Sequence, residues 1–200
     1  MNIICNNCIG ARIYEVTQKR FPNPFMWSLM SCSDFIALAN EYDDLNLSNV
    51  SFELEYYLKN TYKSVLAVLE NDVKVHFIHY IQDDEITEPI RKNGTDMYCK
   101  DILSYAKEKW FGRLERTDEP PTFLFSFNYM KKDNPKYYDM LNQLFACVRK
   151  KMIVLIHDSV EADFVIPDDI SIVKCGDDVM ELNGSALAKA IKQTVFKNEL

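Results

Sequence analysis

The sequence is poor in the residues and runs that mark fibrous, disordered and membrane-spanning chains. Its 200 residues include only 5 Gly and 7 Pro, which argues against a collagen-like or low-complexity protein. No apolar run approaches the roughly 20 residues of a transmembrane helix. Hydrophobic residues make up 48% of the chain, with 12 Phe and 11 Tyr, so we expect a globular protein with one well-filled core.

Three features of the sequence indicate the cellular location and the partners of the protein: its net charge, its N-terminus and its cysteines. A formal net charge of −7 argues against a broad interface with nucleic-acid phosphates. The N-terminus lacks a basic region followed by an apolar stretch, so no secretory signal is expected, and the six Cys indicate reduced thiols. We therefore expect a cytoplasmic protein without a membrane span or a nucleic-acid partner. The composition does not distinguish a monomer from an oligomer.

Hydrophobic periodicity and turn residues predict the secondary structure. In the first half, the predicted elements are a strand at 2–5, a helix at 8–20, an extended segment at 25–30, a helix at 34–41 capped by Ser33, strands at 51–56, 64–69 and 73–80, and a helix at 95–116. In the second half, they are strands at 122–127, 152–157 and 170–174, and helices at 135–149 and 185–197.

The order of these elements predicts the fold class. The strands at 64–69 and 73–80 form a hairpin, because three turn residues separate them. Strand–helix–strand spacing after residue 122 indicates parallel crossovers. We therefore predict one α/β domain over residues 1–200, with three layers, a mixed β-sheet and helices on both faces. Residues 2–5 and 122–127 are expected to share that sheet.

This topology also predicts where a ligand would bind. In open α/β sheets, ligands gather outside the carboxyl ends of the parallel strands. If the first strand and the two late strands run parallel, their ends bring together Asn6-Asn7-Cys8, Ser126 with Asn128, and His157-Asp158.

The stretch Cys5-Asn6-Asn7-Cys8 allows four interpretations: a dithiol redox centre, half of a zinc site, a single nucleophile, or a turn without chemistry. A structural zinc site usually needs a second close pair of ligands, and the other cysteines are scattered, so no metal is predicted. A dithiol at a helix start has a lowered thiol pKa, but Cys5 would end a buried strand, where Cys commonly acts as a small hydrophobe. A glycine-rich phosphate loop is lacking, so no cofactor is predicted.

The single-nucleophile interpretation needs only Cys8. At the start of the first helix, free N–H groups and the helix dipole favour a thiolate, and the amides of Ile9 and Gly10 are placed to hold an oxyanion. Gly10 would also let a substrate approach the first turn closely. The alternative for Cys8 is a buried structural thiol.

A thiol nucleophile also needs a base, and histidine is the usual one. His79 shares the apolar face of its predicted strand with Val75 and Phe77, where packing can fix the ring. His157 stands at the predicted carboxyl end of its strand, followed by Asp158. A histidine on an apolar strand face is commonly a core residue, so His79, His157 and a purely structural role all stay open.

Three short motifs stand in a familiar order along the chain: Asn-Asn-Cys-x-Gly at 6–10 followed by Arg12-Ile13-Tyr14, then His76-Phe77-Ile78-His79-Tyr80, then Ala106, Trp110, Arg113 and Arg116. In order and spacing they resemble a bacterial family of unknown function often labelled as exopolysaccharide-biosynthesis proteins. That resemblance pairs Cys8 with His79 and weakens the dithiol interpretation, since the family usually has Ser in place of Cys5. More weakly, the start resembles proposed papain-like cysteine peptidases, although Pro24-Phe25-Met26-Trp27 lacks their acidic residue.

Two classes of function follow. The first is a cysteine-nucleophile hydrolase or acyl transferase acting on a surface-glycan precursor or its carrier. In it, Cys8 attacks, His79 exchanges the proton, with His157 as the alternative base, and Asn7 or Asn128 orients or polarises the substrate. The second is a non-catalytic module that binds a glycan, a sugar nucleotide or a phosphate.

The predicted substrate-binding residues are Asn6, Gly10, Arg12, Trp27, Asn128 and Arg113, with Trp110 as a second stacking surface. For the arginines, the alternative is a solvated helix face with salt bridges to Glu108 and Glu115, and for Trp110 it is the core. Fast alkylation of Cys8 at neutral pH would favour the enzyme.

Overall fold

The computed structural model describes most of the chain and shows four helices and seven strands in the residues it describes. These residues are 2–17, 23–57, 62–79, 95–117, 119–127, 130–131, 133–160 and 165–176. The helices are α1 (Ile9–Thr17), α2 (Cys32–Glu41), α5 (Thr95–Leu114) and α6 (Lys136–Cys147). The strands are β1 (Asn2–Cys5), β2 (Val50–Tyr57), β3 (Tyr62–Leu69), β4 (Lys74–Phe77), β5 (Pro121–Ser126), β6 (Met152–His157) and β7 (Ile170–Cys175).

Four strands form a parallel sheet in the order β1-β5-β6-β7. β1 pairs with β5 from Asn2↔Pro121 to Cys5↔Leu124, which confirms that the first strand and the strand after residue 120 share a sheet. Every residue of β1 and β6 is buried, as expected for parallel strands that are covered on both faces.

The other three strands form an antiparallel sheet in the order β2-β3-β4. β3 and β4 are the predicted hairpin. Asp72 in its turn has a φ of 61°, a left-handed conformation that Asp tolerates better than most residues.

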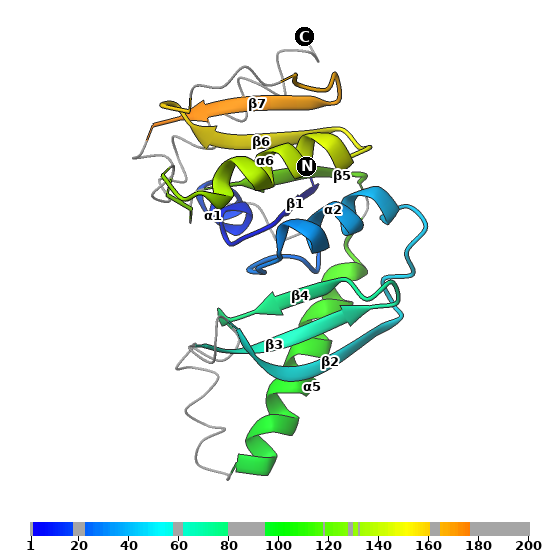
Figure 1. The fold of residues 1–200 in the computed structure, drawn as a ribbon. Coiled ribbons are helices and arrows are strands. Elements are labelled where there is room, and N and C mark those ends of the chain that lie inside the picture. The colour runs from blue at the N-terminus through cyan, green and yellow to red at the C-terminus, as the bar shows by residue number, and fades with distance from the viewer. Residues whose placement is uncertain are drawn as a thin grey trace.

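Leu29 and Met30, which we call the junction, connect the two sheets. Leu29 exchanges two backbone hydrogen bonds with His76 of β4, at 2.7 and 2.9 Å. The Met30 N–H donates to the carbonyl of Asn6, directly after β1, at 2.8 Å. Parallel and antiparallel strands therefore follow one another in one layer, from β7 at one edge to β2 at the other (Figure 1).

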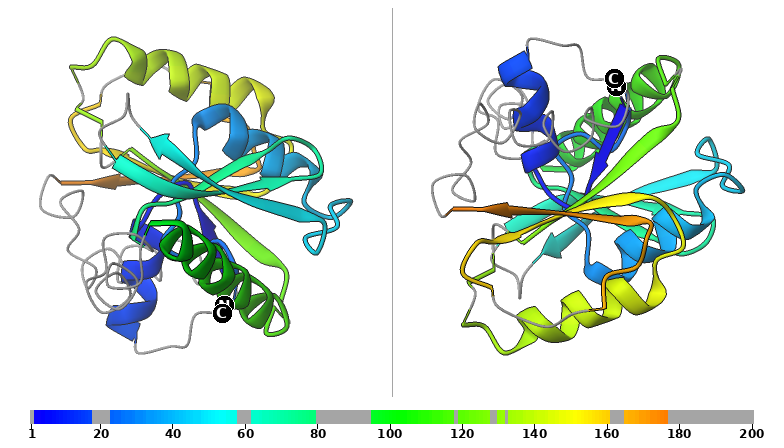
Figure 2. Two further views of the ribbon diagram at one scale, coloured as in Figure 1. Left: turned by 90° about the horizontal axis from the view of Figure 1, so that it is seen from below. Right: turned by 90° about the horizontal axis from the view of Figure 1, so that it is seen from above.

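Helices cover both sides of this layer. Figure 2 shows α1 and α5 on one side and α2 and α6 on the other. The predicted α/β class, with a mixed sheet between two helical layers, is confirmed. One cluster of buried side chains includes residues from both sheets and from all four helices. That residues 1–200 form one domain stays a prediction.

α5 packs a buried stripe against the antiparallel sheet. Trp110 in that stripe donates its Nε1–H to the Leu47 carbonyl at 2.9 Å. Its ring lies edge-on to Phe25 and Phe77, with centroids 5.3 and 6.2 Å away. Trp110 is therefore a core residue and not a stacking surface for a ligand.

Several element boundaries differ from the predicted ones. Ser31, not Ser33, caps α2, because its Oγ accepts the Asp34 N–H at 3.1 Å. β4 ends at Phe77, so His79 lies two residues beyond the strand. The last turn of the first predicted helix and the whole helix at 185–197 fall outside the described residues.

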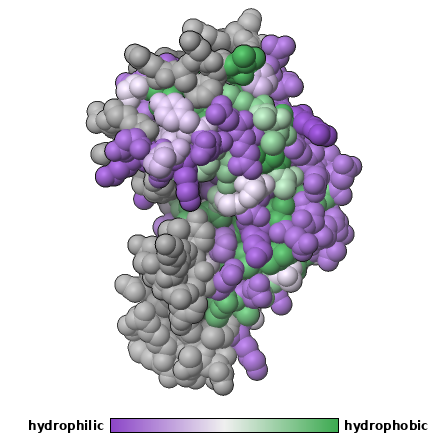
Figure 3. Space-filling model, viewed as in Figure 1, coloured by the Kyte–Doolittle hydropathy of each residue, from purple (hydrophilic) through white to green (hydrophobic). Residues whose placement is uncertain are grey.

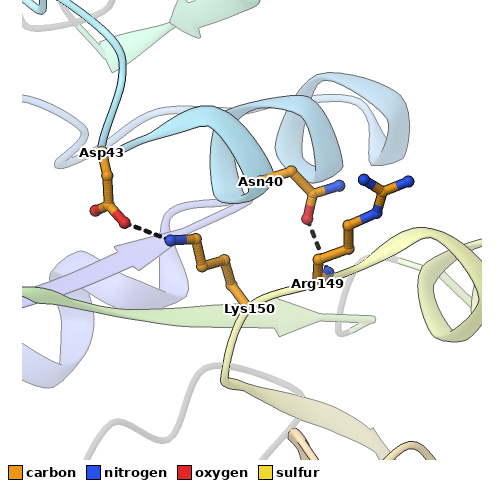
Figure 4. Close-up of polar contacts among 4 residues, drawn as sticks. All are labelled: Asn40, Asp43, Arg149 and Lys150. Atoms are coloured by element: carbon orange, nitrogen blue, oxygen red, sulfur yellow. Dashed lines mark hydrogen bonds and ion pairs between the residues drawn. The ribbon is translucent and has the colours of Figure 1, made fainter.

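α2 and α6 are tied together at the end of both helices. The Asn40 side chain accepts the Arg149 N–H at 2.8 Å and donates to the Cys147 carbonyl at 2.9 Å, and Asp43 pairs with Lys150 (Figure 4). The described part of this face is mainly hydrophilic, with apolar side chains visible between the polar ones (Figure 3).

Gly10 is required by the packing of α1 on β1. A Cβ at Gly10 would lie 2.7 Å from the Cβ of Cys5, whereas a Cβ at Gly112 in α5 would meet nothing within 4 Å. We expect Gly10→Ala to lower the free energy of unfolding by about 1–3 kcal/mol through overpacking. Gly112→Ala should raise it by about 0.5–1 kcal/mol, because Ala is the better helix former. Urea unfolding of both variants checks this, and equal effects of the two would contradict the packing argument.

Candidate functional site

The structure brings Cys8 and His79 together. Cys8 precedes α1 and His79 follows β4, and the Cys8 Sγ lies 3.2 Å from the His79 Nε2. Cys8 is buried and His79 is partly exposed, so the pair lies just beneath the surface. The two residues are 71 positions apart in the sequence.

Two asparagine side chains fix the start of α1. Asn6 forms a reciprocal pair with the backbone of Ser126, accepting its N–H at 2.7 Å and donating to its carbonyl at 3.1 Å. Asn7 donates to the same carbonyl at 3.0 Å and accepts the Ile9 N–H at 3.1 Å. These bonds tie the ends of β1 and β5 together and hold Cys8 at the mouth of the helix.

The protein environment keeps the Cys8 thiol protonated at neutral pH. Burial raises the pKa of Cys8 to about 12, and the positive charge of Arg12 opposes this rise. Arg12 stands one helical turn after Cys8, and its side chain is exposed. The thiol can therefore donate its proton to the His79 Nε2 when the imidazole carries its own proton on Nδ1.

The backbone amides of Ile9 and Gly10, which were expected to hold an oxyanion, face other groups. The Ile9 N–H is used by Asn7. The Gly10 amide faces Cys5. Burial raises the pKa of the Cys5 thiol to about 12, and the amides of Asn7, Gly10 and Asn6 partly oppose this rise. The amide of Cys8 itself faces its own Sγ and lowers the pKa of that thiol. The Cys8 N–H is therefore a candidate for stabilising negative charge beside this sulfur.

Trp27 and Arg12 border the pair. The Trp27 and His79 rings meet edge-on, with centroids 4.9 Å apart and planes at 63°. The Arg12 guanidinium lies 5.3 Å from the centroid of the Trp27 ring, a cation–π contact. The neighbouring Ser28 carbonyl lies 4.0 Å from the Cys8 Sγ. No sequence motif points to Ser28, because its part in the site is a backbone carbonyl.

The other histidines lie elsewhere. His157 is buried at the end of β6, with its Nε2 3.3 Å from the Met130 carbonyl. β6 is two strands away from β1, a separation of about 10 Å. The Nδ1 of His76 lies 3.0 Å from the Ser64 Oγ, and burial lowers the pKa of His76.

Two predicted substrate-binding residues have packing roles in the structure. Arg113 is buried, and its Nη1 donates to the Met26 carbonyl at 3.3 Å, so it is not on a solvated helix face. Gly10 faces Cys5 and not the surface. Asn128 lies outside the described residues.

The described residues hold no group of three Cys, His, Asp or Glu side chains that could bind a metal ion. Among the same residues, no helix is both long enough and apolar enough to cross a membrane.

A comparison with known protein families identifies the family of this chain. The family described as "Domain of unknown function (DUF1919)" matches residues 1–103, just over half of the 200 residues, and the chain belongs to this family. The matched stretch contains Cys8, Arg12, Trp27 and His79. A comparison with curated proteins finds no match.

The raised pKa of Cys8 predicts how its alkylation depends on pH. We expect the rate of reaction with iodoacetamide to rise continuously from about pH 6 to about pH 9, because the thiolate fraction is still increasing over this range when the pKa is about 12. Peptide mass spectrometry reports the rate at Cys8, and the exposed Cys147 in the same sample serves as the reference thiol. A rate that is constant over this range would instead indicate a preformed thiolate–imidazolium pair.

Proposed function

We propose that this member of the DUF1919 family is a cysteine-nucleophile hydrolase or acyl transferase, with Cys8 as the nucleophile and His79 as the general base. The observation that carries the proposal is the 3.2 Å contact between the Cys8 Sγ and the His79 Nε2. A nucleophile and its base need to lie within hydrogen-bond reach. The position of Cys8 at a helix start supports the proposal further, since the helix dipole favours negative charge there.

The chemistry follows from a neutral thiol beside an unprotonated imidazole nitrogen. As the Cys8 sulfur bonds to the carbonyl carbon of the substrate, its proton passes to the His79 Nε2, and the carbonyl oxygen becomes an oxyanion that the Cys8 amide stabilises. Collapse of this intermediate expels the leaving group, which takes the proton from His79, and leaves a thioester on Cys8. Water or an acceptor hydroxyl then attacks the thioester carbon while His79 takes its proton. The C–S bond breaks, the free acid or the acylated acceptor leaves, and the sulfur takes the proton back from His79, which restores the thiol.

Asn7 has an indirect part in this proposal. Both ends of its amide are engaged, one with Ser126 and the other with Ile9. It therefore acts by holding the helix start that carries Cys8, and not by polarising the substrate. Asn6 acts in the same way through Ser126.

For the substrate, we propose a surface-glycan precursor or its carrier, handled in the cytoplasm. The support for this is the resemblance of the three motifs to exopolysaccharide-labelled proteins. The exposed cation of Arg12 above the indole of Trp27 suits such a ligand, because sugar rings stack on aromatic faces and anionic groups pair with guanidinium.

The second candidate function is a non-catalytic module that binds a glycan, a sugar nucleotide or a phosphate. The burial that raises the pKa of Cys8 favours it, since a protonated thiol is a poor nucleophile without a base. In this alternative, Arg12 and Trp27 form the binding surface and Cys8 is a packing residue.

Acylation by an activated ester distinguishes the two functions. We expect p-nitrophenyl acetate to acetylate Cys8, and Cys8→Ala to abolish that adduct. His79→Ala should slow the acylation by about 100-fold or more, as expected for loss of a general base. His157→Ala should leave it unchanged, because His157 lies two strands away from β1. Peptide mass spectrometry measures the adduct separately at Cys8 and at Cys147.

Loss of acylation in His157→Ala with normal acylation in His79→Ala would move the base to His157. Acylation of Cys8 no faster than that of Cys147 in the wild type would leave the binding module as the function.

Arg12 should favour anionic partners at this site. We expect Arg12→Ala to lower the ratio of iodoacetate to iodoacetamide reactivity at Cys8 by about threefold, a modest effect because solvent screens an exposed charge. The rate with the neutral reagent should also fall, since Arg12 lowers the pKa of Cys8. Arg149→Ala, which removes an exposed arginine next to α6, is the matched control. An unchanged ratio in Arg12→Ala would remove Arg12 from the binding site.

A further inference from the structure

The backbone of Trp27 is strained. Its φ is 63°, and the only other non-glycine residue with a positive φ among the described residues is Asp72, in the hairpin turn. A bulky residue in the left-handed region is a true outlier, whereas Asp in a turn is not. Such strain persists only where the surrounding structure holds it, and it gathers at functional sites.

The residues around Trp27 are held from several directions. The buried Arg113 donates to the Met26 carbonyl, directly before Trp27. The Ser28 Oγ, directly after it, donates to the Phe25 carbonyl at 2.6 Å. One residue further, the junction begins, with Leu29 paired to His76.

The result of this bracing is a fixed position for the indole against the imidazole. The Trp27 ring lies edge-on to His79, and the Ser28 carbonyl in the same turn points to the Cys8 Sγ. One short turn therefore contacts both members of the pair. A glycine would relax the backbone at position 27 but would remove the ring that packs on His79.

We propose that Trp27 is a positioning residue whose strained backbone, braced by Arg113, holds the His79 ring in register with the Cys8 thiol. This inference rests on the proposed function, because it assumes that His79 serves Cys8. It gives the buried Arg113 a role in the site that is indirect and acts through the Met26 carbonyl. It also explains why a bulky aromatic stands where glycine would be less strained.

The experiment compares Trp27→Gly, Trp27→Ala and Trp27→Phe with Phe111→Ala, which removes a partly exposed aromatic side chain from α5. For each variant, urea unfolding gives the stability, mass spectrometry gives the alkylation rate of Cys8, and NMR follows the His79 imidazole. The chain has three His, so the His79 signal is identified by its loss in His79→Ala.

We expect Trp27→Gly to be more stable than Trp27→Ala, because glycine adopts a positive φ without strain. Both variants should lose about tenfold in Cys8 alkylation, the size of effect that an aromatic contact of this kind supports. Both should shift and broaden the His79 signal. Trp27→Phe should recover most of the rate, and Phe111→Ala should match the wild type.

Two results would overturn the inference, and they are distinguishable. If His79→Ala slows the alkylation of Cys8 while Trp27→Ala leaves both the rate and the His79 signal unchanged, the pair stands and Trp27 does not position it. If His79→Ala has no effect on Cys8, the proposed function fails and the inference fails with it.

Discussion

The backbone pairing of the junction with β4 and with the end of β1 is the constraint on which the rest of the site depends. Leu29 pairs with His76, and Met30 donates to Asn6. Each such bond contributes only about 1 kcal/mol net, but a buried backbone group left without a partner costs more. These bonds make one layer out of a parallel and an antiparallel sheet. They also bring the end of β1, with Cys8, to the end of β4, with His79.

The site combines a well-packed scaffold with polar groups that are satisfied inside it. The buried amides of Asn6 and Asn7 share the Ser126 carbonyl, and Asn23 donates to Asn2 and Ile3. These asparagine amides specify one arrangement at little cost, because their buried donors have hydrogen-bond partners inside the protein. The unfavourable features of the site are the positive φ of Trp27 and the burial that raises the pKa of Cys8. The raised pKa means that Cys8 lies beside His79 as a protonated thiol at neutral pH.

The second half of the chain completes a site whose side chains all come from the first. The family match ends at residue 103, but β5 lies between β1 and β6 at the centre of the parallel sheet. Its last residue, Ser126, accepts the hydrogen bonds that fix the start of α1. The matched stretch alone would leave β1 without its strand partner and the two asparagines without their acceptor.

The elements and their pairing follow from the sequence alone wherever the signal is local: the hairpin of β3 and β4, the buried strand β6, and the Cys8 position at a helix start. Strand alternation also predicted His79 on the apolar face with Phe77, but β4 ends at Phe77 and His79 lies two residues beyond it. The motif resemblance favoured His79 and the predicted topology favoured His157, and we chose His79. The contact with Cys8 itself depends on strand order and on the junction, which join distant residues. The packing of Arg113 and Gly10 also depends on distant residues. Periodicity shows which residues share a face, but only the tertiary structure shows that Arg113 turns inward to Met26 and that Gly10 faces Cys5.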